Sequence, residues 1–558
     1  MIKDPTRPFP PLAALALAAL GALASLPAQA LTEADLQQRL QTRFAGDRSG
    51  ACVLAAVVLP TQVLRGRVCA APRADGGPGY EQAFEIGSVS KTMTAFLVAD
   101  LVAAGRWSLD DPIAKHLPAG TTVPRQGERQ ITVRDLVTHR AGLPALPTGW
   151  TPADPANPYA SLTEAELLAA LARTPLQGTL GDSNRYSNFG MMVLSVAVAR
   201  ALATEPGTAG DLEQALATRL FAPLGMSGAY IARPPAGTKA AIGHLPGGSV
   251  TPAWTWAAAP NAAGVGGVRA RLDDMVRYAQ AQLGLLQTPL ASRLLATQAE
   301  QAPSSGMNWI RANLRGHALL AHEGGTGGFS SLVALEPAKQ QAVVLLADTA
   351  LTDLGGMGPL ALSLLDPTVP MARARLAVPL PPIWREAFVG DYTLAGMTVK
   401  IWADGERLLA QASGPGQPVM ELRADDQGDL YPLGLNALLR PVMQGGRMAR
   451  FAWHQGGGVM EGVRVGAEPP ATATNPAWKA WAGVYRLAPM FALRVFEETG
   501  KLMVQGTGQP AIEAAVAGTD LLRIAAAGAE VSFQRNDKGE VTGLTLRQGG
   551  QATPGKKE

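Results

Sequence analysis

Residues 84–94 read FEIGSVSKTMT, and the apolar run AFLVA follows at residues 95–99. If a helix begins near Ser88, positions three apart lie on one face of it, so the Lys91 amine can reach the Ser88 hydroxyl. A serine hydroxyl is a weak nucleophile at its ordinary pKa, but a buried lysine can take its proton, and the helix N-terminus favours the negative charge that develops. The stretch therefore predicts Ser88 as a nucleophile activated by Lys91.

The residues around this serine and lysine make the pattern specific. S-x-x-K alone is weak, because a chain of 558 residues is expected to contain about one by chance. Residues 84–91, however, resemble the active-site signature of class C β-lactamases, and the wider penicillin-recognising serine hydrolase superfamily carries S-x-x-K in this context. The resemblance spans residues 35–365 and implies an α/β/α sandwich with an all-helical lobe. Two supporting stretches are LDDP at 109–112 and ITVRDLVTHRAGLP at 131–144.

A tyrosine motif follows in the order that this superfamily shows. The sequence YSN at residues 186–188 matches the family's Y-x-N. The resemblance implies Tyr186 as a second general acid/base and Asn188 as a hydrogen-bond partner of the substrate amide. Read from the residues alone, Tyr186 could instead be a core tyrosine with a satisfied hydroxyl. Which of Lys91 and Tyr186 is the acylation base stays open.

A glycine-rich stretch completes the resemblance. HEGGTGGF at residues 322–329 falls where the family has K-T-G, in its H-x-G variant. The resemblance implies that His322, Gly324 and Gly325 contact the substrate, and that the backbone N–H groups of Ser88 and Gly325 form an oxyanion hole. The alternative is that His322 is a turn residue and the glycines serve a tight hairpin.

His322 stands where many relatives place a lysine that holds a substrate carboxylate. A histidine with an ordinary pKa near 6.5 is mostly neutral at pH 7. We therefore expect weak β-lactamase and carboxypeptidase activity, and better use of carboxylate-bearing substrates as the pH falls from about 7.5 to 6. If His322 were structural, Arg269 or Arg271 would be the alternative anchors. Relatives typically carry serine and threonine where this chain has Ala270 and Arg271. The difference affects either a hydrogen bond at the cleft edge or a helix cap.

The resemblance implies that the protein is an enzyme, a serine hydrolase. It does not decide among several candidate substrates. A peptide containing D-amino acids, as in peptidoglycan, is the leading candidate. A β-lactam, which mimics such a peptide, is the second, and would make the chain a class C-like β-lactamase. An ester is the third candidate, and a non-catalytic penicillin- or peptidoglycan-binding protein is the alternative from another class. His139 is interpreted as structural. We expect no cofactor and no metal, because four other histidines lack metal-ligand spacing: His116, His244, His317 and His454.

The N-terminus and the cysteines indicate an exported protein. Residues 1–30 combine two basic residues, an apolar stretch from Leu12 to about Leu26, and AQA at 28–30, which is typical of a cleaved signal peptide. An uncleaved anchor is disfavoured because the stretch is short of the ~20 residues that a span needs. Cys52 and Cys69 face each other across a predicted hairpin, so in the periplasm or outside the cell a disulfide is favoured over reduced thiols. A net charge of +3 implies no nucleic-acid or membrane-surface partner.

Composition divides the chain into several domains. Proline-rich segments at 369–382 and 467–476 are predicted linkers, which separate a catalytic domain at 31–368 from units at 383–466 and 477–558. The two later units are weak repeats, since FVGDY at 388–392 is echoed by WAGVY at 481–485. They are predicted as small antiparallel β-barrels that resemble the lipocalin-like domains of some penicillin-recognising D-aminopeptidases. By that analogy a barrel loop shapes the active-site entrance; the alternative is that the barrels are spacers.

The predicted elements of the catalytic domain alternate in a way that fits one sheet built from both ends of the domain. Period-two patterns predict strands and period-3.6 patterns predict helices. Strands are expected at 51–59, 63–70, 319–321, 330–335 and 342–347, and helices at 92–104, 164–172, 190–203 and 273–283.

Overall fold

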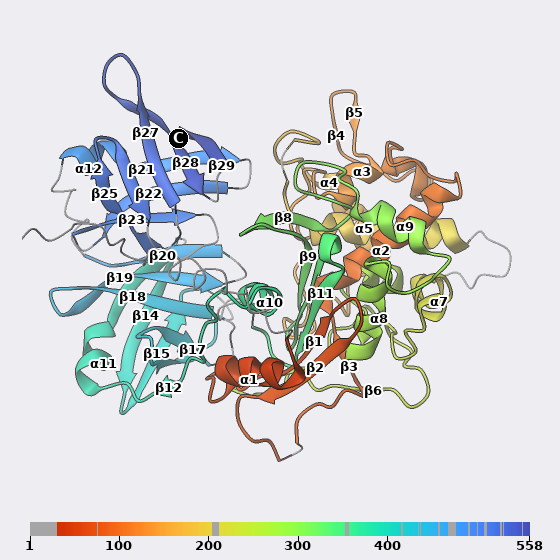
Figure 1. Ribbon diagram of the computed structural model, residues 1–558, viewed down its shortest axis with the longest axis horizontal. Coiled ribbons are helices and arrows are strands. Elements are labelled where there is room, and N and C mark those ends of the chain that lie inside the picture. Colours follow the sequence, from red (N-terminus) through yellow and green to blue (C-terminus); the bar gives the residue numbers. More distant parts are fainter. Residues whose placement is uncertain are drawn as a thin grey trace, which may run out of the picture.

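The computed structural model describes residues 31–558, apart from positions 75, 183, 204–210, 352–356, 395, 415–416, 434, 436, 456–457, 467–475, 489–490, 499, 507–510, 525–526, 528 and 549–550. The predicted signal peptide at 1–30 and almost all of the second predicted linker therefore lie outside the described residues. A mixed α/β unit occupies one side of the molecule, and two β units occupy the other (Figure 1).

A six-stranded antiparallel sheet organises the α/β unit, in the order β2-β1-β11-β10-β9-β8. Its first two strands come from the start of the chain and the others from beyond residue 310, which confirms the sheet predicted from both ends. The strands are β1 (Cys52–Val58), β2 (Val63–Cys69), β8 (Ile310–Leu314), β9 (His317–Gly325), β10 (Ser330–Glu336) and β11 (Gln341–Ala347).

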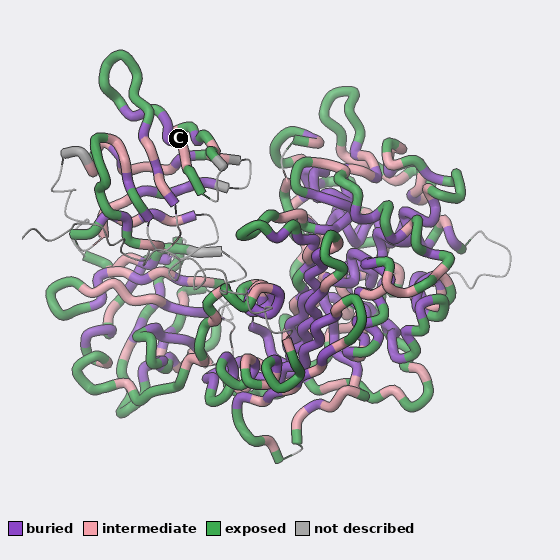
Figure 2. The backbone as a smooth tube through the Cα atoms, viewed as in Figure 1, coloured by how far each residue is buried: buried purple, intermediate pink, exposed green. Residues whose placement is uncertain are grey.

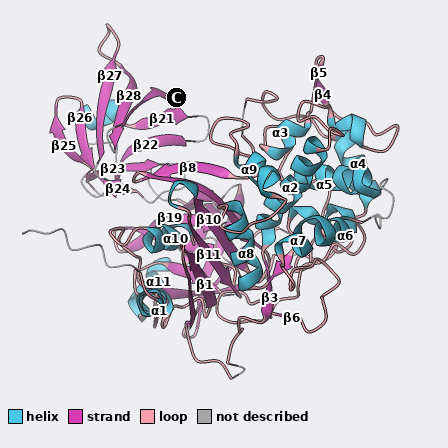
Figure 3. Ribbon diagram, turned by 45° about the vertical axis from the view of Figure 1, so that its right-hand side comes forward, coloured by secondary structure: helices cyan, strands magenta, loops and turns pink. Residues whose placement is uncertain are grey.

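Helices cover both faces of this sheet, because its central strands are apolar on both sides. Leu54, Ala56 and Val58 of β1 pack into the core beneath the helical lobe. The alternate residues of β1 pack into a second core with α1 (Glu33–Phe44) and α10 (Gly358–Leu365), on the face turned toward the β units (Figures 1 and 2). The lobe includes α2 (Ser90–Ala103), α3 (Val133–Val137), α4 (Glu164–Arg173), α5 (Asn188–Ala203) and α9 (Ala291–Gln298), with α8 (Leu272–Gln282) against the sheet (Figure 3). The predicted sandwich with a helical lobe is confirmed.

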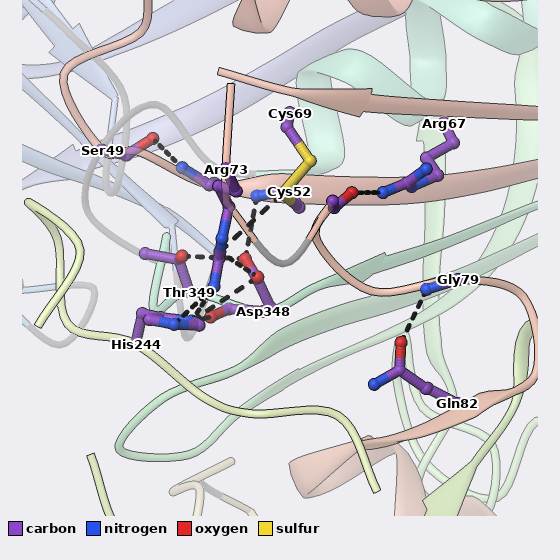
Figure 4. Close-up of a disulfide and its surroundings, with 12 residues drawn as sticks. Ser49, Cys52, Arg67, Cys69, Arg73, Gly79, Gln82, His244, Asp348 and Thr349 are labelled. Atoms are coloured by element: carbon purple, nitrogen blue, oxygen red, sulfur yellow. Dashed lines mark hydrogen bonds and ion pairs between the residues drawn. A yellow bond between two sulfur atoms is a disulfide. The ribbon is translucent and has the colours of Figure 1, made fainter. Parts of the chain in front are cut away.

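The disulfide between Cys52 and Cys69 is present, as predicted. The two residues are directly opposite in the β1–β2 register, and their sulfur atoms are bonded. Beside the bridge, the Arg73 guanidinium forms an ion pair with Asp348 at 2.6 Å and contacts His244 (Figure 4). The bridge and this ion pair together fasten the segment after β2 to the end of β11.

The first β unit is a closed antiparallel barrel. Its sheet runs β12-β16-β15-β14-β13-β20-β19-β18-β17, and an additional β16–β17 pairing closes it. The second unit runs β24-β23-β22-β21-β29-β28-β27-β26-β25, an order that is nearly closed. The predicted barrels are therefore confirmed as folds. The first contains β12 (Ala377–Val378), β13 (Gly390–Leu394), β14 (Met397–Asp404), β15 (Arg407–Ala412), β16 (Met420–Asp425), β17 (Leu430–Pro432), β18 (Ala437–Gln444), β19 (Arg447–Gln455) and β20 (Gly458–Arg464). The second contains β21 (Gly483–Ala488), β22 (Phe491–Glu498), β23 (Lys501–Gly506), β24 (Ile512–Glu513), β25 (Ala515–Gly518), β26 (Leu521–Ile524), β27 (Ala529–Arg535), β28 (Val541–Gln548) and β29 (Gln551–Lys557).

The sequence repeat between the barrels corresponds to a structural repeat. A short helix precedes the first strand of each run: α11 (Pro382–Phe388) before β13 and α12 (Pro476–Trp481) before β21. The Tyr392 hydroxyl donates to the Phe388 carbonyl at 2.8 Å, and the Tyr485 hydroxyl donates to the Trp481 carbonyl at 2.6 Å. The repeated aromatic residues therefore join each helix to the start of its barrel.

The first barrel is joined to the α/β unit by a seam of buried ion pairs, which we call the Arg48 seam. Arg48, at 1% side-chain exposure, pairs with Asp425 of β16 at 3.0 Å. Arg375 pairs with Asp425 at 3.0 Å and with Asp429 at 2.7 Å. β12 also pairs with β16, so part of segment 369–382 belongs to the sheet of the barrel.

Candidate active site

Ser88 lies in a tight turn, the 3₁₀ helix η1 (Gly87–Val89), between β3 (Gln82–Glu85) and α2. Gly87 has a φ of +46°, and a Cβ on it would lie 2.6 Å from the backbone nitrogen of Gly325. A side chain at residue 87 would therefore force the turn away from β9. The sequence predicts a helix that begins near Ser88. In the structure this turn contains Ser88, and α2 begins at Ser90.

Lys91 lies directly beneath the serine and is fully buried. Its Nζ atom is 2.8 Å from the Ser88 hydroxyl oxygen and donates to the Val265 carbonyl oxygen at 2.7 Å. Neither of these partners is charged, and burial holds the pKa of the Lys91 amine well below its ordinary value. Lys91 is thereby suited to accept a proton from Ser88.

Tyr186 covers the same pair from the start of α5. Its ring lies 4.9 Å from the Lys91 amine. The residue is 42% exposed, but its hydroxyl end is enclosed, and burial raises the pKa of Tyr186 despite a hydrogen bond with Ser88. The phenol is therefore protonated at neutral pH and is a donor. Asn188 is the first residue of α5 and is half-buried.

The C-terminal end of β9 lies against the serine turn. A Cβ on Gly324 would lie 2.0 Å from the Ile86 carbonyl oxygen, so β9 approaches the turn as closely as glycine permits. The Ser331 hydroxyl of β10 donates to the same carbonyl at 2.7 Å. This contact holds the backbone of Gly325 beside Ser88, the two residues predicted to supply the oxyanion hole.

His322 lies in β9 rather than in a turn, and only 3% of it is exposed. Its Nδ1 atom is 2.6 Å from the Asn308 carbonyl oxygen, which can only accept, so Nδ1 carries the proton. Burial, with the nearby Lys91 amine, lowers the pKa of His322 to about 3. The gain in positive charge that the sequence predicted between pH 7.5 and 6 therefore does not occur at this residue.

The alternative anchors named from the sequence have other partners. The Arg269 guanidinium lies 3.1 Å from Glu85 and donates to the Trp254 carbonyl at 2.8 Å. Arg271 is the N-cap of α8, where its backbone N–H donates to Asp274 at 2.9 Å, and its side chain donates to Thr238. Arg271, which differs from the residue typical of relatives, is therefore part of a helix cap.

Aromatic side chains line the neighbourhood of the serine turn. Tyr159 stacks on Trp256 with ring centroids 5.2 Å apart and meets Trp254 edge-on at 5.3 Å. A Cβ on Gly266 would lie 3.7 Å from both Gly87 and the Trp256 ring. The Trp256 ring therefore lies close to the backbone beside the serine turn.

Sequence reasoning missed Asn308, and it interpreted His139 as structural. Both residues lie in this site: the His139 ring is 4.4 Å from that of Tyr186, and Asn308 binds His322. Neither residue lies in the serine–lysine, tyrosine or glycine-rich motif. The available signal was weak, namely that asparagine and histidine tolerate left-handed backbone better than most residues.

Among the residues that the structure describes, no group of three or more His, Cys, Asp or Glu residues is placed to hold a metal ion. In the same part of the chain, the helices are too short or too polar to cross a bilayer.

Comparison with known proteins gives one consistent family. The family model described as beta-lactamase matches residues 38–363. The D-alanyl-D-alanine-carboxypeptidase/endopeptidase AmpH of Escherichia coli is 27% identical over 355 residues, which cover 59% of this chain and 89% of the relative. A beta-lactamase of E. coli is 29% identical over 306 residues, which cover 48% of this chain and 75% of the relative. A solved beta-lactamase/D-alanine carboxypeptidase from Yersinia pestis aligns with a TM-score of 0.47 at 23% identity, covering 57% of this chain and 93% of that chain.

Proposed function

This chain is a serine hydrolase of the beta-lactamase family, and we propose that it is exported and cuts peptides containing D-amino acids through a covalent acyl-enzyme. One observation carries the proposal. The Ser88 hydroxyl lies 2.8 Å from a fully buried lysine amine that burial keeps available as a base. A nucleophile within hydrogen-bonding distance of its base is the arrangement that acyl transfer requires.

The first half of the reaction follows from these positions. Ser88 loses its proton to Lys91, and its oxygen bonds to the substrate carbonyl carbon. The backbone N–H groups of Ser88 and Gly325 stabilise the oxyanion, and losing one such donor typically costs about 2.7 to 4 kcal/mol.

The second half needs a proton donor and a water molecule. Tyr186 is protonated, so it supplies a proton to the leaving nitrogen as the carbon–nitrogen bond breaks, and it regains one from the Lys91 ammonium. Water then gives a proton to the Lys91 amine and attacks the acyl-enzyme, the carbonyl–Oγ bond breaks, and the Ser88 oxygen takes that proton from Lys91. Asn188 and Gly324 are proposed to contact the substrate.

The state of His322 indicates which D-peptides suit the site. A neutral histidine whose Nδ1 is bound to Asn308 presents Nε2 as a hydrogen-bond acceptor, and an acceptor does not hold a carboxylate. We therefore propose that internal peptide bonds of peptidoglycan type are preferred over carboxylate-terminated ones, and that β-lactams are hydrolysed weakly. The name of the relative AmpH includes both carboxypeptidase and endopeptidase activities.

Export and the division into domains are also proposed. The Cys52–Cys69 bridge supports an oxidising location such as the periplasm. All the candidate catalytic residues fall between 88 and 325, which supports assigning the chemistry to residues 31–368 and a supporting role to the barrels at 383–466 and 477–558.

Labelling with a fluorescent penicillin followed by a chase tests the function. The wild-type protein should take up the label and lose it slowly. A peptide in which the bond at the D-residue is internal should be cleaved faster than a peptide in which the D-residue carries the free terminal carboxylate. Rapid loss of label with poor peptide cleavage would indicate a β-lactamase. An unlabelled protein that cleaves only esters would indicate an esterase. Label without turnover of any substrate would indicate a penicillin-binding protein that is not an enzyme.

A further inference from the structure

His139 holds the backbone on both sides of Tyr186. Its carbonyl oxygen accepts from the Arg185 N–H at 2.7 Å, and its Nδ1 accepts from the Ser187 N–H at 3.2 Å. Its ring also lies against the Tyr186 ring, with centroids 4.4 Å apart and planes inclined by 33°. A single residue therefore fixes the position and the tilt of the proposed proton donor.

Asn308 orients His322 in a similar way. Its carbonyl oxygen accepts from Nδ1 of His322 at 2.6 Å, which sets the tautomer of the imidazole. Its own N–H donates to the Val137 carbonyl at 2.8 Å, two residues before His139. Burial lowers the pKa of the His139 ring well below its ordinary value, and a hydrogen bond with the Asn308 side chain opposes part of that lowering. The two supports therefore adjoin.

Both residues adopt a backbone conformation that costs free energy. His139 has a φ of 56° and Asn308 has a φ of 58°, in the left-handed region that residues with a Cβ seldom occupy. Both are over nine-tenths buried. Nε2 of His139 and the side-chain amide of Asn308 are buried beside each other. Strained backbone that gathers in one place is more often retained for function than for stability.

We propose that His139 and Asn308 are positioning residues: His139 places Tyr186 for proton transfer, and Asn308 holds His322 with Nε2 as an acceptor toward the substrate. The inference rests on the proposed acyl-transfer function. Neither residue touches the reacting atoms, so each acts through the side chain that it orients. The expected consequence of losing either support is a misplaced partner, and a displacement of about 1 Å in an active site can lower the rate about 10²-fold.

The His139 part is tested with a pair of variants. His139→Gly suits the left-handed backbone but removes the ring and the acceptor of the Ser187 N–H. His139→Asn tolerates the same backbone and places an oxygen where Nδ1 lies. We expect kcat to fall about 10²-fold in His139→Gly with KM little changed, and His139→Asn to recover about tenfold of that loss. Equal kcat in wild type and His139→Gly, or a loss in both variants that tracks their melting temperatures, would overturn the assignment.

The Asn308 part compares Asn308→Ala with Asn308→Gly. Glycine keeps the left-handed backbone and the carbonyl that binds His322, whereas alanine disfavours that conformation. We expect kcat/KM about tenfold lower for Asn308→Ala than for Asn308→Gly. Arg315→Gly is the matched control, because Arg315 has a φ of 53° in the exposed β8–β9 turn. An equal kcat/KM in Asn308→Ala and Asn308→Gly would overturn the role of Asn308. A loss of activity in Arg315→Gly would do so as well.

Penicillin labelling separates this inference from the proposed function. If wild type is not acylated at Ser88, the function itself fails. If wild type is acylated at Ser88 and the His139 and Asn308 variants cleave substrate at the wild-type rate, only the positioning roles fail.

Discussion

Two regions of this molecule bury ionisable side chains, and they treat them in opposite ways. In the Arg48 seam, arginines meet carboxylates: Arg375 pairs with Asp429 at 2.7 Å and Arg48 with Asp425 at 3.0 Å. In the candidate active site, Lys91 meets a hydroxyl and a carbonyl, and His322 meets a carbonyl. The seam thus provides charged partners, whereas these hydrogen bonds of the two active-site groups are to neutral partners.

The pKa values follow this difference. In the seam, burial acts to raise the pKa of Asp429, but hydrogen bonds from Arg440 and Arg375 outweigh it, so the pKa is lowered and the charge is kept. In the active site, burial is not opposed by an anion, and the pKa of Lys91 and of His322 is lowered. Burial with pairing keeps the charge of a side chain, while burial without pairing lowers the pKa of an amine and so favours the form that can act as a base.

The largest expected effect comes from breaking the active-site side of this comparison. Ser88→Ala should abolish turnover while the fold remains intact, because it removes one hydroxyl from the cleft. Lys91→Ala should lower kcat/KM by roughly 10²- to 10⁴-fold, the usual contribution of a general base. The double variant should be scarcely worse than Ser88→Ala, since residues that act as a unit are not additive. Steady-state kinetics on one D-peptide measures all three.

Ser90→Ala is the matched control for the nucleophile. Ser90 is fully buried, and its hydroxyl accepts from the Val268 N–H at 3.1 Å. The variant should lose about 1 to 3 kcal/mol of stability by leaving that N–H unpaired, and keep its catalytic activity. An inactive Ser90→Ala with an active Ser88→Ala would exchange the roles of the two serines.

Removing a charge partner from the seam should give the next largest effect. Asp425→Ala leaves Arg48 buried without its carboxylate, and breaking a buried pair typically costs about 3 to 5 kcal/mol. Denaturant unfolding should show that loss, and acylation by penicillin at 25 °C should proceed at the wild-type rate. A fall in the acylation rate at temperatures where the variant is fully folded would show that the first barrel shapes the active site.

The last pair of expected effects concerns pH and sharpens the contrast at His322. The folded pKa of His322 is about 3 and lies below its unfolded value near 6.5, so the unfolded state binds more protons between these values. Stability therefore falls as the pH drops from about 6.5 to about 3, by at most about 1.4 kcal/mol per pH unit, and His322→Gln should remove this slope.

Activity should be insensitive to the same residue near neutral pH. The ratio of kcat/KM for a substrate with and without its carboxylate should stay flat from about pH 7.5 to 6, because His322 remains neutral. His322→Lys should raise the ratio. A wild-type ratio that rises toward pH 6 would restore the conditional anchor that the sequence suggested.

Much of the fold was predictable because its strands and helices are strongly patterned. The apolar runs of β1 and β11 and the alternation in the barrels indicate burial directly. The Cys52–Cys69 pairing followed from the turn at Pro60 and the register of the hairpin. The family motifs supplied the serine, the lysine and the tyrosine, and the structure brings these three together.

The rest depends on contacts between segments distant in sequence. The low pKa of His322 arises from the burial of β9 and from Asn308, which no motif marks. Arg48 and Asp425 are 377 residues apart, and each alone has the appearance of a surface charge in the sequence. Left-handed backbone at His139 and Asn308 likewise follows from packing rather than from local propensity.

The central claim is that Ser88, with the Lys91 amine as its base, forms the acyl-enzyme. Its most direct test is mass spectrometry of the penicillin-treated protein, with the adduct located by peptide mapping. We predict one adduct on Ser88 in the wild type, a strongly slowed appearance of the same adduct in Lys91→Ala, and none in Ser88→Ala. An adduct on Ser90 or on any other residue, or an adduct that persists in Ser88→Ala, would contradict the claim.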